Sequence, residues 1–224
     1  MNALKKLFPY ALTSAAVIGL WHLFTLTDND LSTSTDNKLV LLNQALSTIF
    51  FYKTLFWLVL ANLGVFISKS ILNKQNQAAV ATACVGLAFY FYIGQFVDKN
   101  CAFPYYRVFV SQSVAEEYLQ RPIEEAGYYI GPILTEKIED RQMEFRRYAI
   151  SGLGDINYKP ATKMLGQILV DKTEVEWIRA DAYVALTKFN TASARKILRD
   201  FQVSSSDTTD QKVVALGNYF LLPN

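Results

Sequence analysis

The sequence contains one histidine, His22, and two cysteines, Cys84 and Cys101, among its 224 residues. The two cysteines lack the C-x-x-C spacing of a zinc or haem-attachment motif, and no second histidine completes a set of metal ligands. The chain also lacks a glycine-rich phosphate loop, a nucleophile elbow and a carboxylate pair with a companion base. We therefore expect a protein that is not an enzyme, with no catalytic residue, no metal site, no cofactor and no small-molecule substrate.

Charged residues are also scarce, at 19% of the chain against 51% hydrophobic residues. A soluble domain carries a charged share nearer a quarter, so the chain is too apolar for that class. The excess lies in three apolar runs, at residues 8–26, 49–68 and 78–97. Runs of about 20 residues match the thickness of a bilayer core. We therefore predict a membrane domain at residues 1–100 with three transmembrane helices.

Two of these runs have an alternative interpretation. Lys53 and Asn62 interrupt the second run, which fits a buried helix of a globular core as well as a span. The first run follows Lys5 and Lys6, so a cleaved signal peptide is the alternative to a retained anchor. No clear small-x-small cleavage site precedes Asp28. We therefore favour the retained anchor.

The distribution of lysines predicts how these helices are oriented. Lys5 and Lys6 precede the first run, and Lys69 and Lys74 lie between the second and third runs. The positive-inside rule places the N-terminus and the loop at 69–77 in the cytoplasm. With three spans, the C-terminal domain is then extracytoplasmic, which in a bacterium means a multi-pass inner-membrane protein with a periplasmic domain. A cytoplasmic tail remains the alternative, because small charge changes can reverse a topology.

Small residues predict where these helices pack. Spacings of four residues place small side chains on one face of each of two helices, at Ala11, Ala15 and Gly19 in the first and at Ala79 and Ala83 in the third. Such faces allow helix backbones to approach closely, either within the chain or against a partner's helix. Residues 38–49 have a helical period and either extend the second span or lie at the interface; we favour the extension because no loop signal separates them. We expect Cys101 to be a free thiol, with an intermolecular disulfide as the alternative.

The second half of the chain contains an internal repeat with a period of 33 residues. Residues 101–112 are aromatic and poorly periodic and read as a connector, and 113–224 as a helical domain. Helices are expected from Ser113 to before Pro122 and over 123–138. Two helical hairpins follow, with helices at 141–153 and 160–170 and then at 174–188 and 192–201. The matched positions are Phe145, Arg146, Ala149, Leu153, Ile156, Ala161, Leu165 and Ile168 with Ile178, Arg179, Ala182, Leu186, Phe189, Ala194, Leu198 and Phe201. A third, truncated copy extends to the C-terminus. Self-similarity at this period is typical of stacked α-hairpins.

The repeated pattern Arg-x-x-Ala-x-x-x-Leu, a turn, and then Ala-x-x-x-Leu-x-x-Ile/Phe resembles HEAT-like repeats, of the short kind also seen in phycobilisome lyases. Gly152 and Gly154 depart from the pattern, because the second copy has Ala185 and Thr187 there. The resemblance implies a concave surface that binds proteins and carries over no catalytic residue. The predicted fold class is thus all-α, with three transmembrane helices followed by a short HEAT-like α-solenoid.

Aromatic and basic side chains of this domain are candidates for partner binding. Tyr and Trp are enriched at binding hot spots, although Trp177 fits the core as well. The candidates are Tyr148, Tyr158, Trp177, Tyr183, Arg195 and Arg199. Nucleic acid is not expected as a partner, because residues 98–224 hold 16 Lys or Arg and 17 Asp or Glu and therefore have no basic excess.

Membrane helices joined to a binding fold without catalytic residues predict an accessory, assembly or scaffold subunit of a cell-envelope membrane complex. Its partners would be the lipid bilayer and one or more proteins. The alternative is a regulatory or structural subunit of a transporter or channel that works as an oligomer. An enzyme acting on envelope lipid or peptidoglycan ranks third, because no catalytic constellation is present.

Overall fold

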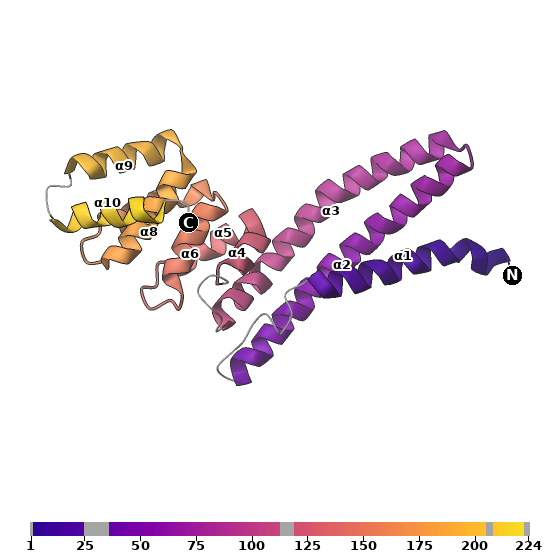
Figure 1. Cartoon of the computed structure of the whole chain (residues 1–224), viewed down its shortest axis with the longest axis horizontal. Helices are drawn as coiled ribbons and strands as arrows, with labels where there is room; N and C mark the ends of the chain where they lie inside the picture. The colour runs from indigo at the N-terminus through magenta and orange to yellow at the C-terminus, as the bar shows by residue number, and fades with distance from the viewer. Residues whose placement is uncertain (1, 25–35, 113–118, 205–207, 222–224) are drawn as a thin grey trace. The chain divides into compact units, whose positions relative to one another are not determined.

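Helices account for all of the regular structure in the computed structural model, which describes residues 2–24, 36–112, 119–204 and 208–221. Within these residues there is no strand, in agreement with the all-α prediction. The chain divides into two compact units, residues 1–114 and 115–224 (Figure 1). Each unit is described by itself below.

The first unit consists of three helices, α1 (Asn2–Phe24), α2 (Asp36–Leu72) and α3 (Asn76–Ser111). α2 and α3 pack along each other as a long antiparallel hairpin (Figure 1). The hairpin turns at Lys74, which has the left-handed φ of 59°. α1 packs against α2. Among the described residues, α2 and α3 are the two helices long and apolar enough to cross a membrane.

Over the described residues, the first of the three predicted spans is not among the candidate spans. It does form a helix, α1, but its apolar segment over the described residues is the shorter Lys6–Leu20. The remainder of the predicted span, up to residue 26, lies partly outside the described residues. The structure itself therefore shows two long apolar helices, which are candidate membrane spans by length and composition.

The two candidate membrane spans, α2 and α3, are longer than the apolar runs that predicted them. α2 begins at Asp36, so residues 38–49 extend the second helix as expected. The predicted connector at 101–112 was wrong, because residues 101–111 are the last three turns of α3. Their aromatic residues obscured the helical period, and Pro104 lies inside the helix, where sequence rules place a break.

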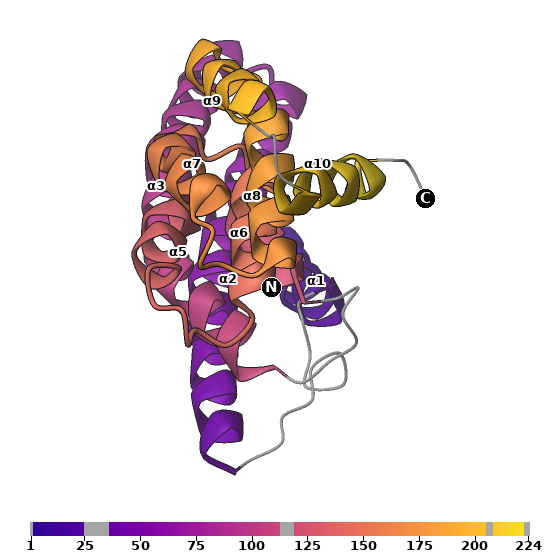
Figure 2. The same cartoon turned by 90° about the vertical axis from the view of Figure 1, so that its left-hand side faces the viewer.

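The second unit consists of short helices arranged around α8. Its elements are α4 (Arg121–Ala126), the 3-10 helix η2 (Gly127–Ile130), α5 (Gly131–Lys137), α6 (Arg146–Asp155), the 3-10 helix η3 (Lys159–Ala161), α7 (Thr162–Val170), α8 (Glu176–Phe189), α9 (Ala192–Ser204) and α10 (Thr208–Phe220). α8 packs against α6, α7, α9 and α10, and residues 178–186 are buried without interruption. Figure 2 shows α10 crossing α8.

Two sequence expectations about this unit were wrong at helix boundaries. The single helix expected at 123–138 is three pieces, because Gly127 adopts a φ of 61° and ends α4. The helix expected from Arg141 begins at Arg146 instead, after Phe145, whose φ of 60° is left-handed. The helix expected from Ser113 falls largely on residues 113–118, outside the described residues. Pro122 lies in the first turn of α4, where proline is tolerated.

The glycines that depart from the repeat pattern lie where helices approach closely. A Cβ at Gly152 would be 2.8 Å from Ile123 Cδ1, and a Cβ at Gly154 would be 2.8 Å from Ala185 Cα. The second contact involves backbone, which cannot move aside as the end of a side chain can. Gly154 therefore allows α6 to lie directly on α8.

Two arginines of the repeat, Arg146 and Arg179, make equivalent contacts 33 residues apart. Arg146 Nε donates to the carbonyl of Ile138 at 2.7 Å, and Arg179 Nε donates to the carbonyl of Leu169 at 2.8 Å. The guanidinium of Arg146 forms two hydrogen bonds of 2.8 Å with Glu174, and that of Arg179 pairs with Asp210. Each arginine thus donates a hydrogen bond to a carbonyl at the end of a preceding helix. Each also pairs with a carboxylate near the start of a following helix: Glu174 lies just before α8, and Asp210 lies in the first turn of α10.

Candidate functional site

The structure separates the six residues predicted for partner binding into buried and exposed groups. Tyr158 and Tyr183, expected as exposed anchors, are buried. The ring of Tyr158 lies against Gly131, and its burial raises the pKa of the phenol. The ring of Tyr183 lies against Gly217, and its hydroxyl accepts a hydrogen bond of 2.8 Å from Gln202 Nε2. Both tyrosines therefore belong to the core, because the two glycines leave room for their rings.

Trp177 lies on the surface, with 51% of its area exposed. Its ring centroid is 6.2 Å from that of Phe220, and the guanidinium of Arg147 lies 5.7 Å from the Trp177 ring and 5.1 Å from the Phe220 ring. Tyr219, which is 70% exposed, contacts Phe220 at 6.0 Å between ring centroids. We call these four residues the aromatic surface; they come from α6, α8 and α10. Sequence reasoning identified Trp177 but missed the other three residues, because the crossing of α10 over α8 brings them together.

Tyr148 lies beside this surface. Its half-buried ring is 5.9 Å from the guanidinium of Arg147, so it borders the aromatic surface as the prediction of a contact residue requires. Arg195 and Arg199 are exposed on α9. Arg195 Nη1 donates to the backbone and side-chain oxygens of Asn190, at 3.0 and 2.7 Å, and so binds the end of α8. Asn190 is thus the hydrogen-bond partner of Arg195, and Arg195 does not belong to the aromatic surface around Trp177.

Arg147 is held in place by Asp181. Its Nε donates to Asp181 Oδ2 at 2.8 Å, and the Asp181 side chain is only 7% exposed. Burial raises the pKa of this carboxyl from 3.8 to about 6, although Arg147 and, more weakly, Lys188 lower it. At neutral pH, burial therefore disfavours the charged form of Asp181, which is the form that binds Arg147.

We expect Asp181→Asn to stabilise the C-terminal unit at pH 7.5 by about 1–2 kcal/mol, since a raised pKa penalises the charged form by about 1.4 kcal/mol per pKa unit and the lost hydrogen bond to Arg147 offsets part of the gain. The folded state binds the proton more tightly than the unfolded state, so Asp181 costs stability as the pH rises from about 4 to above about 6. The difference between variant and wild type should vanish as the pH falls to 4. Denaturant unfolding of the full chain measures this, with Trp177 as the fluorophore and Trp21 and Trp57 replaced by Phe.

Asp171→Asn is the matched control for this pH dependence. Hydrogen bonds from Thr173, together with Arg141, lower the pKa of Asp171, so its charged form favours folding. Asp171 therefore stabilises the folded chain at pH values above the pKa that it has in the unfolded chain, and this stabilisation is lost as the pH falls. The two variants should therefore shift stability at neutral pH in opposite directions; the same direction in both would contradict the assignment.

Polar contacts connect the helices of the first unit. Lys53 of α2 donates to Asp98 of α3, and the Lys53 side chain is mostly buried. Asn62 Nδ2 donates to Ser14 Oγ of α1 at 3.1 Å, and Lys69 Nζ donates to the Lys6 carbonyl at 2.8 Å. These contacts make α1 antiparallel to α2. Sequence reasoning identified Lys53 only as an interruption of the second apolar run and missed its partner, because α2 and α3 meet only in the folded hairpin.

The small residues predicted as packing faces differ in how far they are buried. Ala79 is buried in α3 and Ala83 is half-buried. Ala11, Ala15 and Gly19 are exposed on α1, and no atom lies within 4 Å of a Cβ placed at Gly19. α1 faces α2 through residues such as Tyr10 and Ser14 instead. The small-residue face of α1 is therefore unused within the chain, which leaves the partner-helix alternative.

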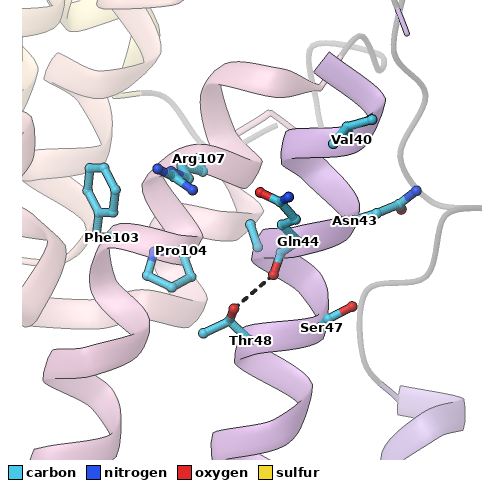
Figure 3. A pocket seen from close by; sticks show the side chains of 9 residues that line it. Val40, Asn43, Gln44, Ser47, Thr48, Phe103, Pro104 and Arg107 are labelled. Atoms are coloured by element: carbon cyan, nitrogen blue, oxygen red, sulfur yellow. Dashed lines mark hydrogen bonds between the residues drawn. The ribbon is translucent and has the colours of Figure 1, made fainter. Parts of the chain in front are cut away.

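A groove of about 630 Å³ lies between α2 and α3, beyond the Lys53–Asp98 pair (Figure 3). Gln44 of α2 and Arg107 of α3 line opposite sides of it, and Phe103 and Pro104 form its α3 wall. The guanidinium of Arg107 lies 4.9 Å from the centroid of the Phe103 ring. Sequence reasoning missed this groove, since it assigned the segment that carries Arg107 to a connector.

The remaining observations concern metals, thiols and related proteins. Over the described ranges, no group of three or more His, Cys, Asp and Glu side chains is placed to hold a metal ion. Cys84 and Cys101 are free thiols. No protein-family model matches the chain, and no curated protein or solved structure matches it. Its function is therefore inferred from its own residues and contacts.

Proposed function

We propose that this chain is a non-enzymatic integral membrane protein whose HEAT-like C-terminal domain binds a protein partner, as an accessory, assembly or scaffold subunit of a cell-envelope complex. The observation that carries this proposal is the aromatic surface of Arg147, Trp177, Tyr219 and Phe220. Trp177 and Tyr219 keep most of their area exposed, although the surrounding helices bury tyrosines of similar size. Exposed aromatic groups beside a guanidinium are typical of binding hot spots.

The contacts of α1 support three membrane spans, the finer part of the proposal. Lys6 and Lys69 meet at one end of the first unit, and Ser14 meets Asn62 further along the two helices. α1 therefore runs alongside the apolar part of α2 that leads to the loop at 73–75. The basic residues of the N-terminus and of this loop share one end, which the positive-inside rule assigns to the cytoplasm. The C-terminal unit would then be extracytoplasmic.

The equivalent contacts of Arg146 and Arg179 support the HEAT-like repeat. Position-matched residues also meet directly, because Lys188 pairs with Asp155, 33 residues earlier. A repeated helix that stacks on its own equivalent is the defining contact of such arrays. In them, the exposed edge of the helical layer forms the binding surface. The aromatic surface lies on that layer, since α6, α8 and α10 all contribute to it.

A photoreactive amino acid at Trp177 in the full chain, crosslinked in the native membrane, tests the proposal. We expect one dominant crosslinked protein, identified by mass spectrometry. The matched control places the same amino acid at Val203, an exposed apolar residue of α9 that is 85% exposed and outside the aromatic surface. Recovery of only lipid or self-crosslinks from Trp177, or an identical pattern from Val203, would contradict a docking role.

A polar contact inside the membrane helices favours a second candidate, a regulatory or structural subunit of a transporter or channel. Asn62–Ser14 is an amide–hydroxyl contact between apolar helices, and polar groups at membrane depth often mark transport pathways. Three helices form such a pathway only as an oligomer. A monomeric mass in native-like lipid would contradict this candidate and leave the first one intact.

A further inference from the structure

The Lys53–Asp98 pair divides the α2–α3 hairpin into two parts. Between this pair and the loop at 73–75, α3 carries no Asp, Glu, Lys or Arg, and α2 carries only Lys69, near the loop. At a rise of 1.5 Å per residue this part is about 30 Å long, which matches the bilayer core. Both helices continue outward beyond the pair. The pair therefore marks the edge of the hydrocarbon core, if the hairpin is inserted as proposed.

The groove of Figure 3 begins at the depth where lipid headgroups lie. Thr48 and Phe103 are each five residues beyond the ion pair, about 7 Å along the helix axes. Headgroup layers are about 5–8 Å thick on each side of the core. Gln44 and Arg107 are each nine residues beyond the pair, about 13 Å, and they line the groove at the outer edge of this layer. A long arginine side chain reaches back toward headgroups from such a position.

The chemistry of the groove fits an anion with an apolar body. Arg107 is the one charged residue among those that line it, and no carboxylate of the described residues lies within ion-pair distance of Arg107. Its half-buried guanidinium contacts the Phe103 ring, which orients it. Gln44 adds an amide donor, and Val40, Ala45 and Pro104 add apolar surface.

We propose that this groove binds the phosphate of an anionic phospholipid, with Arg107 and Gln44 as the donors. Arg107 offers the paired N–H groups that match phosphate oxygens. A headgroup with a net negative charge is preferred, because the lining supplies one positive charge and no acid to receive an ammonium group. This proposal rests on the insertion of α2 and α3 in the membrane and not on the aromatic surface.

The test is native mass spectrometry of the purified full chain in mild detergent, titrated with dioctanoyl phosphatidylglycerol or dioctanoyl phosphatidylcholine. We expect the chain to retain one phosphatidylglycerol molecule and to bind phosphatidylcholine more weakly. Arg107→Gln should weaken phosphatidylglycerol binding about tenfold or more, the usual effect of losing a charge-assisted hydrogen bond. Lys99→Gln removes the same charge from an exposed position of α3 outside the groove and should change the affinity less than about twofold.

Gln44→Glu provides a second variant that keeps Arg107. The new carboxylate would line the same groove as the guanidinium and cancel its net positive charge, so phosphatidylglycerol binding should fall as it does in Arg107→Gln. Equal helical circular dichroism and a single elution peak would show that both variants fold. Equal affinity for the two lipids, or equal losses in Arg107→Gln and Lys99→Gln, would overturn the proposal in favour of nonspecific lipid contacts.

Three further outcomes separate the sources of the anion and the two proposals. Displacement of the lipid by equimolar inorganic phosphate would overturn the lipid assignment, because the groove would then bind free phosphate. An acidic protein that co-purifies through Arg107, without lipid selectivity, would also overturn it. Flotation of the chain with liposomes tests membrane insertion separately: a floating chain without lipid selectivity contradicts the headgroup site alone, and a chain that does not float contradicts the membrane assignment as well.

Discussion

Arg179→Ala is expected to destabilise the C-terminal unit by about 3–5 kcal/mol, the usual cost of leaving one partner of a buried ion pair alone. Arg179 is only 1% exposed, and Asp210 is buried beside it. The substitution also removes the donor to the Leu169 carbonyl. Lys172, 3.9 Å from Asp210 and largely exposed, replaces little of this interaction. Denaturant unfolding followed by Trp177 fluorescence, in full chains with Trp21→Phe and Trp57→Phe, measures the loss.

Two further variants show whether the cost comes from the unpaired charge. Arg141→Ala also removes an ion-pairing arginine, but Arg141 is 50% exposed and should cost less than about 1 kcal/mol. The double variant Arg179→Met with Asp210→Leu removes both charges and should recover much of the lost stability, because apolar side chains of similar volume replace buried ion pairs well. A double variant as unstable as Arg179→Ala would show that Arg179 acts through packing rather than through charge.

Gly154→Ala is expected to destabilise the same unit by about 1–3 kcal/mol, although alanine is the better helix former. The added Cβ would lie 2.8 Å from Ala185 Cα, so α6 and α8 must move apart. A loss of this size lowers the melting temperature by several degrees in a unit of about 110 residues. Thermal unfolding followed by Trp177 fluorescence measures the shift.

Gly166→Ala is the control within the same unit. Its Cβ would lie 3.0 Å from Ile197 Cδ1 and 3.3 Å from Ile197 Cγ2, side-chain atoms that need to shift by only a few tenths of an ångström. We therefore expect a change near zero or a small stabilisation from the gain in helix propensity. If Gly154→Ala were no more costly than Gly166→Ala, the close contact between α6 and α8 would not exist in solution.

The sequence predicted local structure well where one signal dominated. Long runs without charge identified α2 and α3, because few structures other than a membrane helix accommodate 20 apolar residues. Helical periodicity over 38–49 correctly predicted the extension of α2. Predictions failed at 101–111 and 123–138, where Pro104 lies within a helix and Gly127 breaks one. The helix continues through Pro104 but ends at Gly127. The packing around each residue decides whether the helix continues or ends there.

The candidate sites depended on contacts that the sequence does not display. Trp177 was identified by its residue type, but Tyr158 and Tyr183, chosen on the same ground, fill space beside Gly131 and Gly217. The neighbours of Trp177 in the aromatic surface, Phe220 and Arg147, belong to other helices. Residue type alone therefore could not separate core aromatics from surface aromatics.

By itself, the amino-acid sequence determined that this protein is helical, that its first half contains apolar helices of membrane length, and that its second half has a 33-residue period. These properties follow from composition and spacing along one chain. Only the tertiary structure decided that Lys53 pairs with Asp98, that Arg179 pairs with Asp210, and that Gln44 and Arg107 line one groove. Each of these pairs joins residues at least 31 positions apart, and burial and electrostatic pairing depend on which helices meet in space.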